Sequence, residues 1–165
     1  SRAGWTTKIH MVAADARTAV TFSLSPGNAG DAPEGRKLLK TLENQGSEGA
    51  HLIMDKAYEG NDTQQLILAL EMLPVVPPKS NRLTKWEYDK ELYKKRNEVE
   101  RLFRRLKGFR RIFSRFDKLD VVFLFFIHFA LIVDALISVN RPYMKMQRNG
   151  LHPFVNPLQV KATAP

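Results

Sequence analysis

The sequence contains no cysteine, so disulfide frameworks, thiolate metal sites and cysteine nucleophiles are all excluded. It also lacks a glycine-rich phosphate loop, the usual signature of nucleotide hydrolysis. Ser-His-Asp catalysis finds no support, and the four histidines have no metal-ligand spacing. No charged and then apolar leader opens the chain, which gives no case for secretion. What is present is a globular composition of 165 residues, with 44% hydrophobic and 26% charged side chains.

Acidic residues are scarce relative to basic ones. Lys and Arg number 26 against 17 Asp and Glu, which gives a formal net charge of +9. The excess lies within residues 79–118, which hold 15 Lys and Arg and 6 Asp and Glu, so the remainder of the chain is neutral. A localised basic block indicates a polyanionic partner, either nucleic acid or an anionic membrane surface.

The pattern of hydrophobic residues predicts an α/β fold. Residues 8–14 and 20–24 have the lengths and alternation of two strands, and the short polar turn between them predicts an antiparallel hairpin. From residue 141 onward, prolines and scattered polar residues predict an irregular tail, which leaves residues 1–140 as one domain. Between hairpin and tail we expect, in order, a helix from residue 31, a strand at 51–54, a helix at 64–72, a strand at 74–76, a basic helix from 84 to about 106 and an apolar helix at 121–139.

One acid of the basic helix is surrounded by cations. On a continuous helix, Glu100 shares a sector of roughly 80° with Tyr93, Arg96, Arg104 and Lys107, beside the apolar face. One interpretation is that Glu100 neutralises its arginine neighbours through i,i+4 ion pairs. The other is that Glu100 is a metal-binding carboxylate flanked by cations that position phosphates, which requires a second carboxylate.

Asp55 is the candidate for that second carboxylate. It ends the apolar run 52–54, and sites in open α/β sheets lie at the carboxyl ends of strands. The alternative role of Asp55 is to form a turn or cap a helix, which is common for an acid after a strand.

The apolar stretch 121–139 has the length of a membrane span. Only His128, Asp134 and Ser138 interrupt it. A charge such as Asp134 is costly inside a bilayer, and no second span exists, so we expect a buried helix and no membrane association.

The motifs resemble those of DDE transposases of the insertion-sequence five type. The spacing Tyr93-x2-Arg96-x3-Glu100-x6-Lys107 is similar to the Tyr-Arg-Glu-Lys signature of that family. Two further segments match in the expected order: residues 55–60 resemble the second-acid segment, and residues 1–10 resemble the stretch that follows the first acidic motif. The resemblance runs over about residues 1–140.

This resemblance implies an RNase H-like mixed sheet with flanking helices, which binds two Mg²⁺ or Mn²⁺ ions through three carboxylates and cleaves and joins transposon-end DNA. Asp55 would be the second acid and Glu100 the third, and both would bind metal. The implied partners are terminal inverted repeats, target DNA and further copies of the protein, in the bacterial cytoplasm at the nucleoid. The implied DNA-binding residues are Tyr93, Arg96, Arg101, Arg104, Arg105 and Lys107.

The sequence departs from the family in one decisive place. The first acid belongs to an Asp-Ser-Thr-type strand that this sequence does not contain, and Asp15 lies one strand too late to replace it. Because that strand is central, we expect a fold incomplete at its N-terminus, with unpaired strands beside the gap, that is poorly folded and inactive unless an upstream segment supplies the acid. The alternative is a non-catalytic DNA-binding fragment that occupies transposon ends or inhibits an intact transposase.

Overall fold

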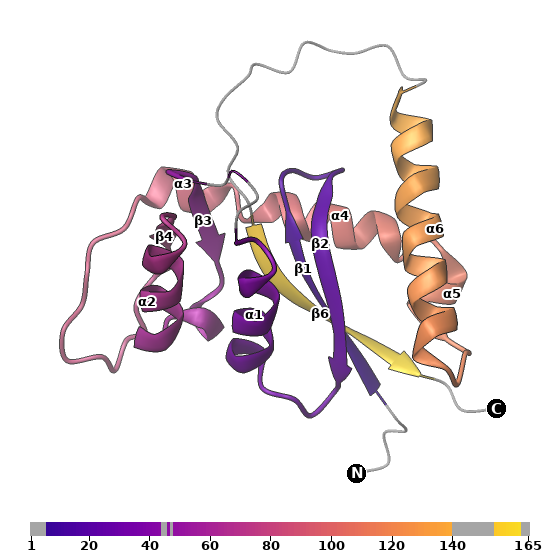
Figure 1. The fold of residues 1–165 in the computed structure, drawn as a ribbon, viewed down its shortest axis with the longest axis horizontal. Helices are drawn as coiled ribbons and strands as arrows, with labels where there is room; N and C mark the ends of the chain where they lie inside the picture. The colour runs from indigo at the N-terminus through magenta and orange to yellow at the C-terminus, as the bar shows by residue number, and fades with distance from the viewer. Residues whose placement is uncertain (1–5, 44–45, 47, 140–153, 163–165) are drawn as a thin grey trace.

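A mixed sheet organises the chain, and helices pack on both of its faces (Figure 1). The computed structural model describes residues 6–43, 46, 48–139 and 154–162. The order of the strands is β2-β1-β6-β3-β4, and β5 pairs with β6 beside this path. The strands are β1 (Thr6–Ala13), β2 (Ala19–Pro26), β3 (His51–Met54), β4 (Leu73–Val75), β5 (Ser114–Arg115) and β6 (Phe154–Ala162). The helices are α1 (Asp31–Lys40), the 3-10 turn η1 (Lys56–Tyr58), α2 (Asn61–Ala69), α3 (Lys90–Lys94), α4 (Asn97–Leu106), α5 (Arg110–Phe113) and α6 (Asp120–Val139).

The predicted hairpin is confirmed by β1 and β2. The two strands pair antiparallel, with Ile9 opposite Leu24. The carboxylate of Asp15 closes the turn by accepting hydrogen bonds from the backbone N–H groups of Arg17 and Thr18, at 2.7 and 2.8 Å. The structure thus agrees with a short polar turn between two paired strands.

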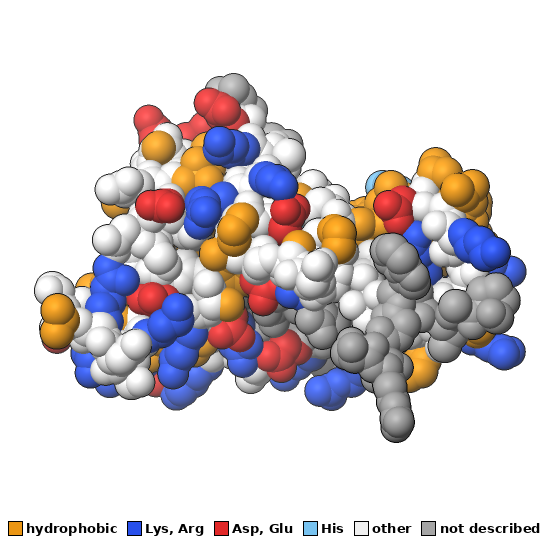
Figure 2. All heavy atoms as spheres, turned by 90° about the horizontal axis from the view of Figure 1, so that it is seen from below, with side chains coloured by type: hydrophobic (Ala, Val, Ile, Leu, Met, Phe, Trp, Pro, Cys, Tyr) orange, Lys and Arg blue, Asp and Glu red, His pale blue; other side chains and the backbone are white. Residues whose placement is uncertain are grey.

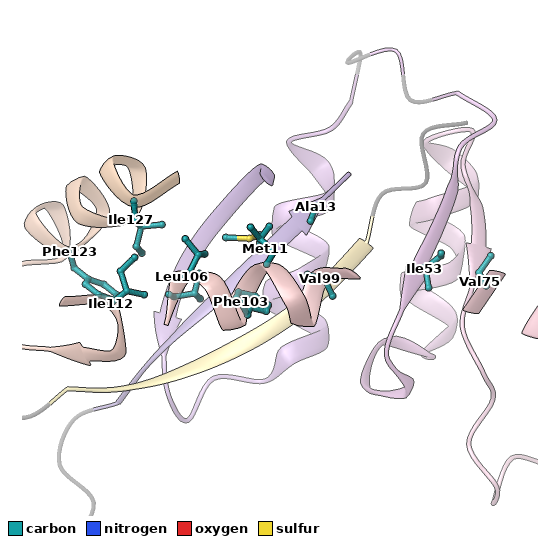
Figure 3. Close-up of a cluster of buried hydrophobic side chains, with 13 residues drawn as sticks. Met11, Ala13, Ile53, Val75, Val99, Phe103, Leu106, Ile112, Phe123 and Ile127 are labelled. Atoms are coloured by element: carbon teal, nitrogen blue, oxygen red, sulfur yellow. The ribbon is translucent and has the colours of Figure 1, made fainter. Parts of the chain in front are cut away.

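Two apolar cores lie on opposite faces of the sheet. On one face, Ile9, Met11 and Ala13 of β1 contact α4 and α6, as Figure 3 shows for part of this cluster. On the other face, Val12 of β1 contacts Leu39 of α1 and other residues of α1, α2 and β3. The alternation along β1 is that of a strand with both faces buried.

The predicted basic helix is interrupted, which corrects the expectation of one continuous helix from residue 84. Helix α3 begins at Lys90, where the side chain of Asp89 accepts a hydrogen bond of 2.8 Å from the N–H of Leu92. Between α3 and α4 the backbone bonds span three residues, since the N–H of Arg96 binds the carbonyl of Tyr93 at 3.0 Å. This tighter turn separates the two helices and makes Arg96 the residue that caps α4.

The prediction of an irregular tail was wrong for residues 154–162. These residues form β6, which pairs antiparallel with β1 along its length and parallel with β3 at Ile53 and Met54. The expected unpaired edges beside a central gap are therefore absent from the described sheet, because β6 lies between β1 and β3. The rest of the predicted tail lies outside the described residues.

The expectation of a buried apolar helix holds for only one face of α6. Phe123 and Ile127 are fully buried, whereas Phe125 and Phe129 are more than half exposed. By length and composition alone, α6 could cross a bilayer.

Candidate functional site

Asp55 lies directly after the last residue of β3, at the carboxyl end of the strand. It precedes η1, yet its side chain forms no capping hydrogen bond there. The turn is held from behind, because Tyr58 is fully buried and the N–H of Tyr58 binds the carbonyl of Asp55 at 2.9 Å. Gly35 of α1 allows this packing, since a Cβ at that position would lie 2.3 Å from the ring of Tyr58. The turn therefore presents the carboxylate of Asp55 away from the core.

Glu100 lies in the first turn of α4, and the buried face of that helix determines its position. Val99, Leu102, Phe103 and Leu106 are all buried, so α4 packs firmly along one face of the sheet (Figure 3). Glu100 stands beside this apolar face, where its side chain is 41% exposed. The helix thus presents a carboxylate at the border between core and solvent.

Arg96 brings the two predicted acids together. Its Nη1 lies 3.0 Å from Oδ2 of Asp55 and 2.9 Å from Oε1 of Glu100. The two carboxylate oxygens are therefore separated by no more than two hydrogen-bond lengths. Both carboxylates keep access to solvent, with exposed fractions of 39% for Asp55 and 41% for Glu100. Of the two i,i+4 ion pairs in the first interpretation of Glu100, the pair with Arg96 is present, and Asp55 joins it as a third member.

Tyr93 borders the same cluster. The guanidinium carbon of Arg96 lies 5.8 Å from the centre of the Tyr93 ring, and Tyr88 meets that ring edge-on at 5.6 Å. Burial raises the pKa of Tyr93, and the carboxylates of Asp55 and Glu100 add to this effect against the opposing charge of Arg96. Tyr93 is therefore a neutral hydroxyl group beside the two acids at neutral pH.

The remaining residues predicted to bind DNA differ in their surroundings. Arg104 of α4 and Lys107, directly after that helix, are exposed. Arg101 binds Glu98 of the same helix at 2.7 Å. Arg105 instead points toward α6, where Asp134 accepts hydrogen bonds from its Nε at 3.0 Å and its Nη2 at 2.5 Å.

The donor set matches part of a divalent-metal site. Carboxylate oxygens are the ligands that Mg²⁺ and Mn²⁺ prefer, and Asp55 and Glu100 supply them from two elements. Within the part of the chain that the structure describes, no group of three or more His, Cys, Asp or Glu side chains could hold a metal ion. The structure thus brings together two carboxylates, those of Asp55 and Glu100, where the family resemblance implies three.

A second ion cluster, which the sequence analysis missed, lies next to Asp55. Glu59 is 7% exposed, and its carboxylate binds Arg82 at 3.0 Å and Lys79 at 3.4 Å. The guanidinium of Arg82 also lies 4.5 Å from the ring centre of Trp86. Burial alone would raise the pKa of Glu59, but hydrogen bonds from Lys79 and Arg82 outweigh burial and lower it. This cluster joins the loop after β4 to the turn that carries Asp55. The only sequence signal for the cluster is that Glu59 lies four residues after Asp55.

Comparison with known proteins gives a family match and a similar protein. Residues 3–133 match the family described as the transposase DDE domain. A protein of Brucella ovis named as a transposase for insertion sequence element IS6501 is 33% identical over 129 residues, which cover 76% of this chain and 94% of the relative. No solved structure matches the chain.

Proposed function

Because the chain belongs to the transposase DDE domain family, we propose that it is the C-terminal portion of an enzyme that cleaves and joins transposon-end DNA, with Asp55 and Glu100 as two of its acids. The observation that carries this proposal is the meeting of both predicted carboxylates at the guanidinium of Arg96. The family assignment supports the role in transposition, and the geometry supports the choice of these two acids.

We propose an RNase H-like sheet of the insertion-sequence five type for this domain. An antiparallel pair, β1 and β2, and a parallel pair, β3 and β4, flank a central strand position, which agrees with that proposal. In this chain β6 takes the central position. An upstream segment that supplies the strand with the first acid would take this position in place of β6, and this chain alone would be inactive.

Asp55 and Glu100 would hold divalent metal in the proposed site, with Mg²⁺ or Mn²⁺ as the ion. Two bound ions would supply activation of water and then of a DNA 3′-hydroxyl, together with charge stabilisation of the phosphodiester transition state. Arg96 would balance the charge of the two carboxylates and orient the scissile phosphate. Tyr93 would donate its hydroxyl proton in a hydrogen bond to a phosphate oxygen, since its raised pKa keeps it protonated.

The DNA backbone would run along the exposed side of α4. Arg104 and Lys107 are exposed there, and such cations contribute affinity and salt dependence. Arg101 and Arg105 remain predicted contacts, although each faces a carboxylate in the structure. Transposon terminal repeats and target DNA are the proposed partners.

Metal-directed cleavage of the polypeptide tests the proposed site. Fe²⁺ that replaces Mg²⁺ reduces added hydrogen peroxide to hydroxide and a hydroxyl radical, and we expect the chain to be cut near residues 55 and 100. Asp55→Asn and Glu100→Gln should each abolish both cuts. Glu98→Gln, on the other side of the same helix, is the matched control and should leave them unchanged. Cuts elsewhere, or equal sensitivity to Glu98→Gln, would contradict the assignment.

A non-catalytic DNA-binding fragment is the second candidate function. The exposed cations of α4 favour it, because DNA binding through them needs no third acid. Glu100→Gln should leave the affinity for transposon-end DNA within a factor of about 3, whereas Lys107→Ala should lower that affinity and its salt dependence. Metal-dependent cleavage of transposon-end DNA by this chain alone would contradict the proposed inactivity.

A further inference from the structure

Helix α6 has two apolar faces, and only one of them is buried within the part of the chain that the structure describes. On the inner face, Phe123, Ile127 and Ala130 are buried in the core, and Asp134 binds Arg105 of α4. The opposite side carries five large exposed side chains, here named the outer stripe: Val121 (69% exposed), Phe125 (63%), Phe129 (52%), Ile132 (59%) and Leu136 (61%).

The outer stripe is continuous along the helix. At 100° per residue its five members fall within an arc of roughly 80°, nearly opposite Asp134. From Phe125 to Leu136 the stripe follows the alternating spacing of a coiled-coil seam. The rings of Phe125 and Phe129 stack, with centroids 6.3 Å apart. Figure 2 shows hydrophobic side chains gathered at the end of the molecule that α6 forms.

The size and chemistry of the stripe indicate a protein partner. Its five side chains expose about 500 Å² together, so two facing copies would bury about 1,000 Å², which reaches the lower limit of a biological interface. No Lys, Arg, Asp or Glu belongs to the stripe, so a partner helix needs no complementary charge. An apolar patch of this size on a soluble domain marks an interaction site.

We propose that the outer stripe is the interface of a homodimer, in which α6 of a second copy packs antiparallel against α6 of the first. A two-fold axis places the same apolar stripe on both sides, which makes the contact self-complementary. The inner face of α6 stays on its own core, and the seam spacing allows the two helices to interlock. A bilayer is the less suitable occupant, because a helix crossing it would have to leave α4 and expose Asp134 to hydrocarbon.

This interface deepens the proposed function, since it gives the multimer expected of a transposase a defined surface. The role of this dimer in transposition rests on the proposed function. The existence of the interface depends only on the exposed side chains of α6. The stripe lies on the side of α6 that faces away from α4, which carries Glu100. A change in the stripe should therefore leave the cluster around Arg96 intact.

Sedimentation of the full chain without DNA tests the proposal. We expect the wild type to be a dimer and Ile132→Glu to raise its dissociation constant by at least roughly 100-fold, because two buried like charges would face each other. Leu68→Glu is the matched control: Leu68 is 57% exposed on α2, outside the stripe, and its change should leave the dimer intact. Circular dichroism of both variants reports whether each remains folded.

Cross-linking provides an independent measurement, since the chain has no cysteine. Phe129 lies near the middle of the stripe and hence near the expected two-fold axis. Phe129→Cys should form a covalent dimer under mild oxidation, whereas Leu68→Cys should remain monomeric.

A monomeric wild type, or a dimer unaffected by Ile132→Glu, would overturn the proposal. A monomer that sediments with anionic vesicles, and whose vesicle binding depends on Phe125, would also overturn the proposal. That result would assign the stripe to a membrane surface. Metal-directed cuts near residues 55 and 100 in the Ile132→Glu protein distinguish a failed dimer from a failed active site, because those cuts depend on the acids alone.

Discussion

Arg96 and Arg105 stand at the two ends of α4, and each binds carboxylates from distant elements, but the two clusters differ in exposure. Arg96 lies between Asp55 and Glu100, whose side chains are about two-fifths exposed. Arg105 binds Asp134, whose side chain is only 11% exposed. In the proposed site the exposed acids would exchange the guanidinium for a metal ion, whereas the less exposed pair joins α6 to α4. The same type of ion pair would thus serve the proposed chemistry at one end of the helix, and it joins two helices at the other.

Removal of the buried acid should have the largest effect on stability. Asp134→Ala removes the largely buried carboxylate that accepts two hydrogen bonds from Arg105, so we expect the free energy of unfolding to fall by about 3 kcal/mol. Urea denaturation measures this change, and Glu87→Ala, at an exposed loop position, is the control with an expected change within about 0.5 kcal/mol. The double variant Arg105→Met with Asp134→Leu should recover most of the loss. An equal loss in Glu87→Ala would contradict this role of Asp134.

The cluster around Glu59 should give an intermediate effect that depends on pH. The pKa of Glu59 in the folded protein is held below its ordinary value of 4.5. The unfolded chain therefore binds a proton at this carboxylate more readily than the folded chain does, and the free energy of unfolding rises with pH over this range. The contribution of Glu59 is complete above pH 4.5 and is lost as the pH falls through its folded-state pKa. Glu59→Gln should therefore cost about 2 kcal/mol at neutral pH and almost nothing in acid, as urea denaturation over a pH series would measure. A difference from wild type that stays constant with pH would contradict the ionic role of Glu59.

The exposed cluster should give the smallest change in stability. Arg96→Met should alter the free energy of unfolding by less than about 1 kcal/mol, since ion pairs with solvent access contribute little. The same urea titration measures this change beside that of Asp134→Ala. A loss as large as that of Asp134→Ala would make the Asp55–Arg96–Glu100 cluster a structural element rather than a site open to ligands.

Local sequence patterns predicted those parts of the fold that local interactions determine. The hairpin with its turn at Asp15, the strand before Asp55 and the apolar helix after residue 120 were confirmed. Alternation and turn chemistry are contained within a few residues, so a single sequence reveals them. The positions of Asp55 and Glu100 followed from such patterns together with the family resemblance.

The parts that the sequence did not reveal depend on partners far along the chain. Residues 154–162 include Pro157, which lacks an N–H group and argues against a central strand. They form β6 because β1 and β3 pair with them, an interaction that no local pattern encodes. Likewise, the helical angles of a continuous helix gave no indication that Arg105 would meet Asp134, since that pair depends on how α6 packs.

The position of β6 has a consequence for how the chain acquires its fold during synthesis. β1 lies near the beginning of the described chain and β6 near its end, yet the two strands pair along their whole length. The hairpin and all the described helices leave the ribosome before residues 154–162. Until those residues emerge, β1 can pair with β2 but not with β6. Contacts between such distant segments slow folding, because a long loop must close before the pairing repays its entropy. The described sheet therefore closes after synthesis of its other described elements, in a step that pairs β1 with β6.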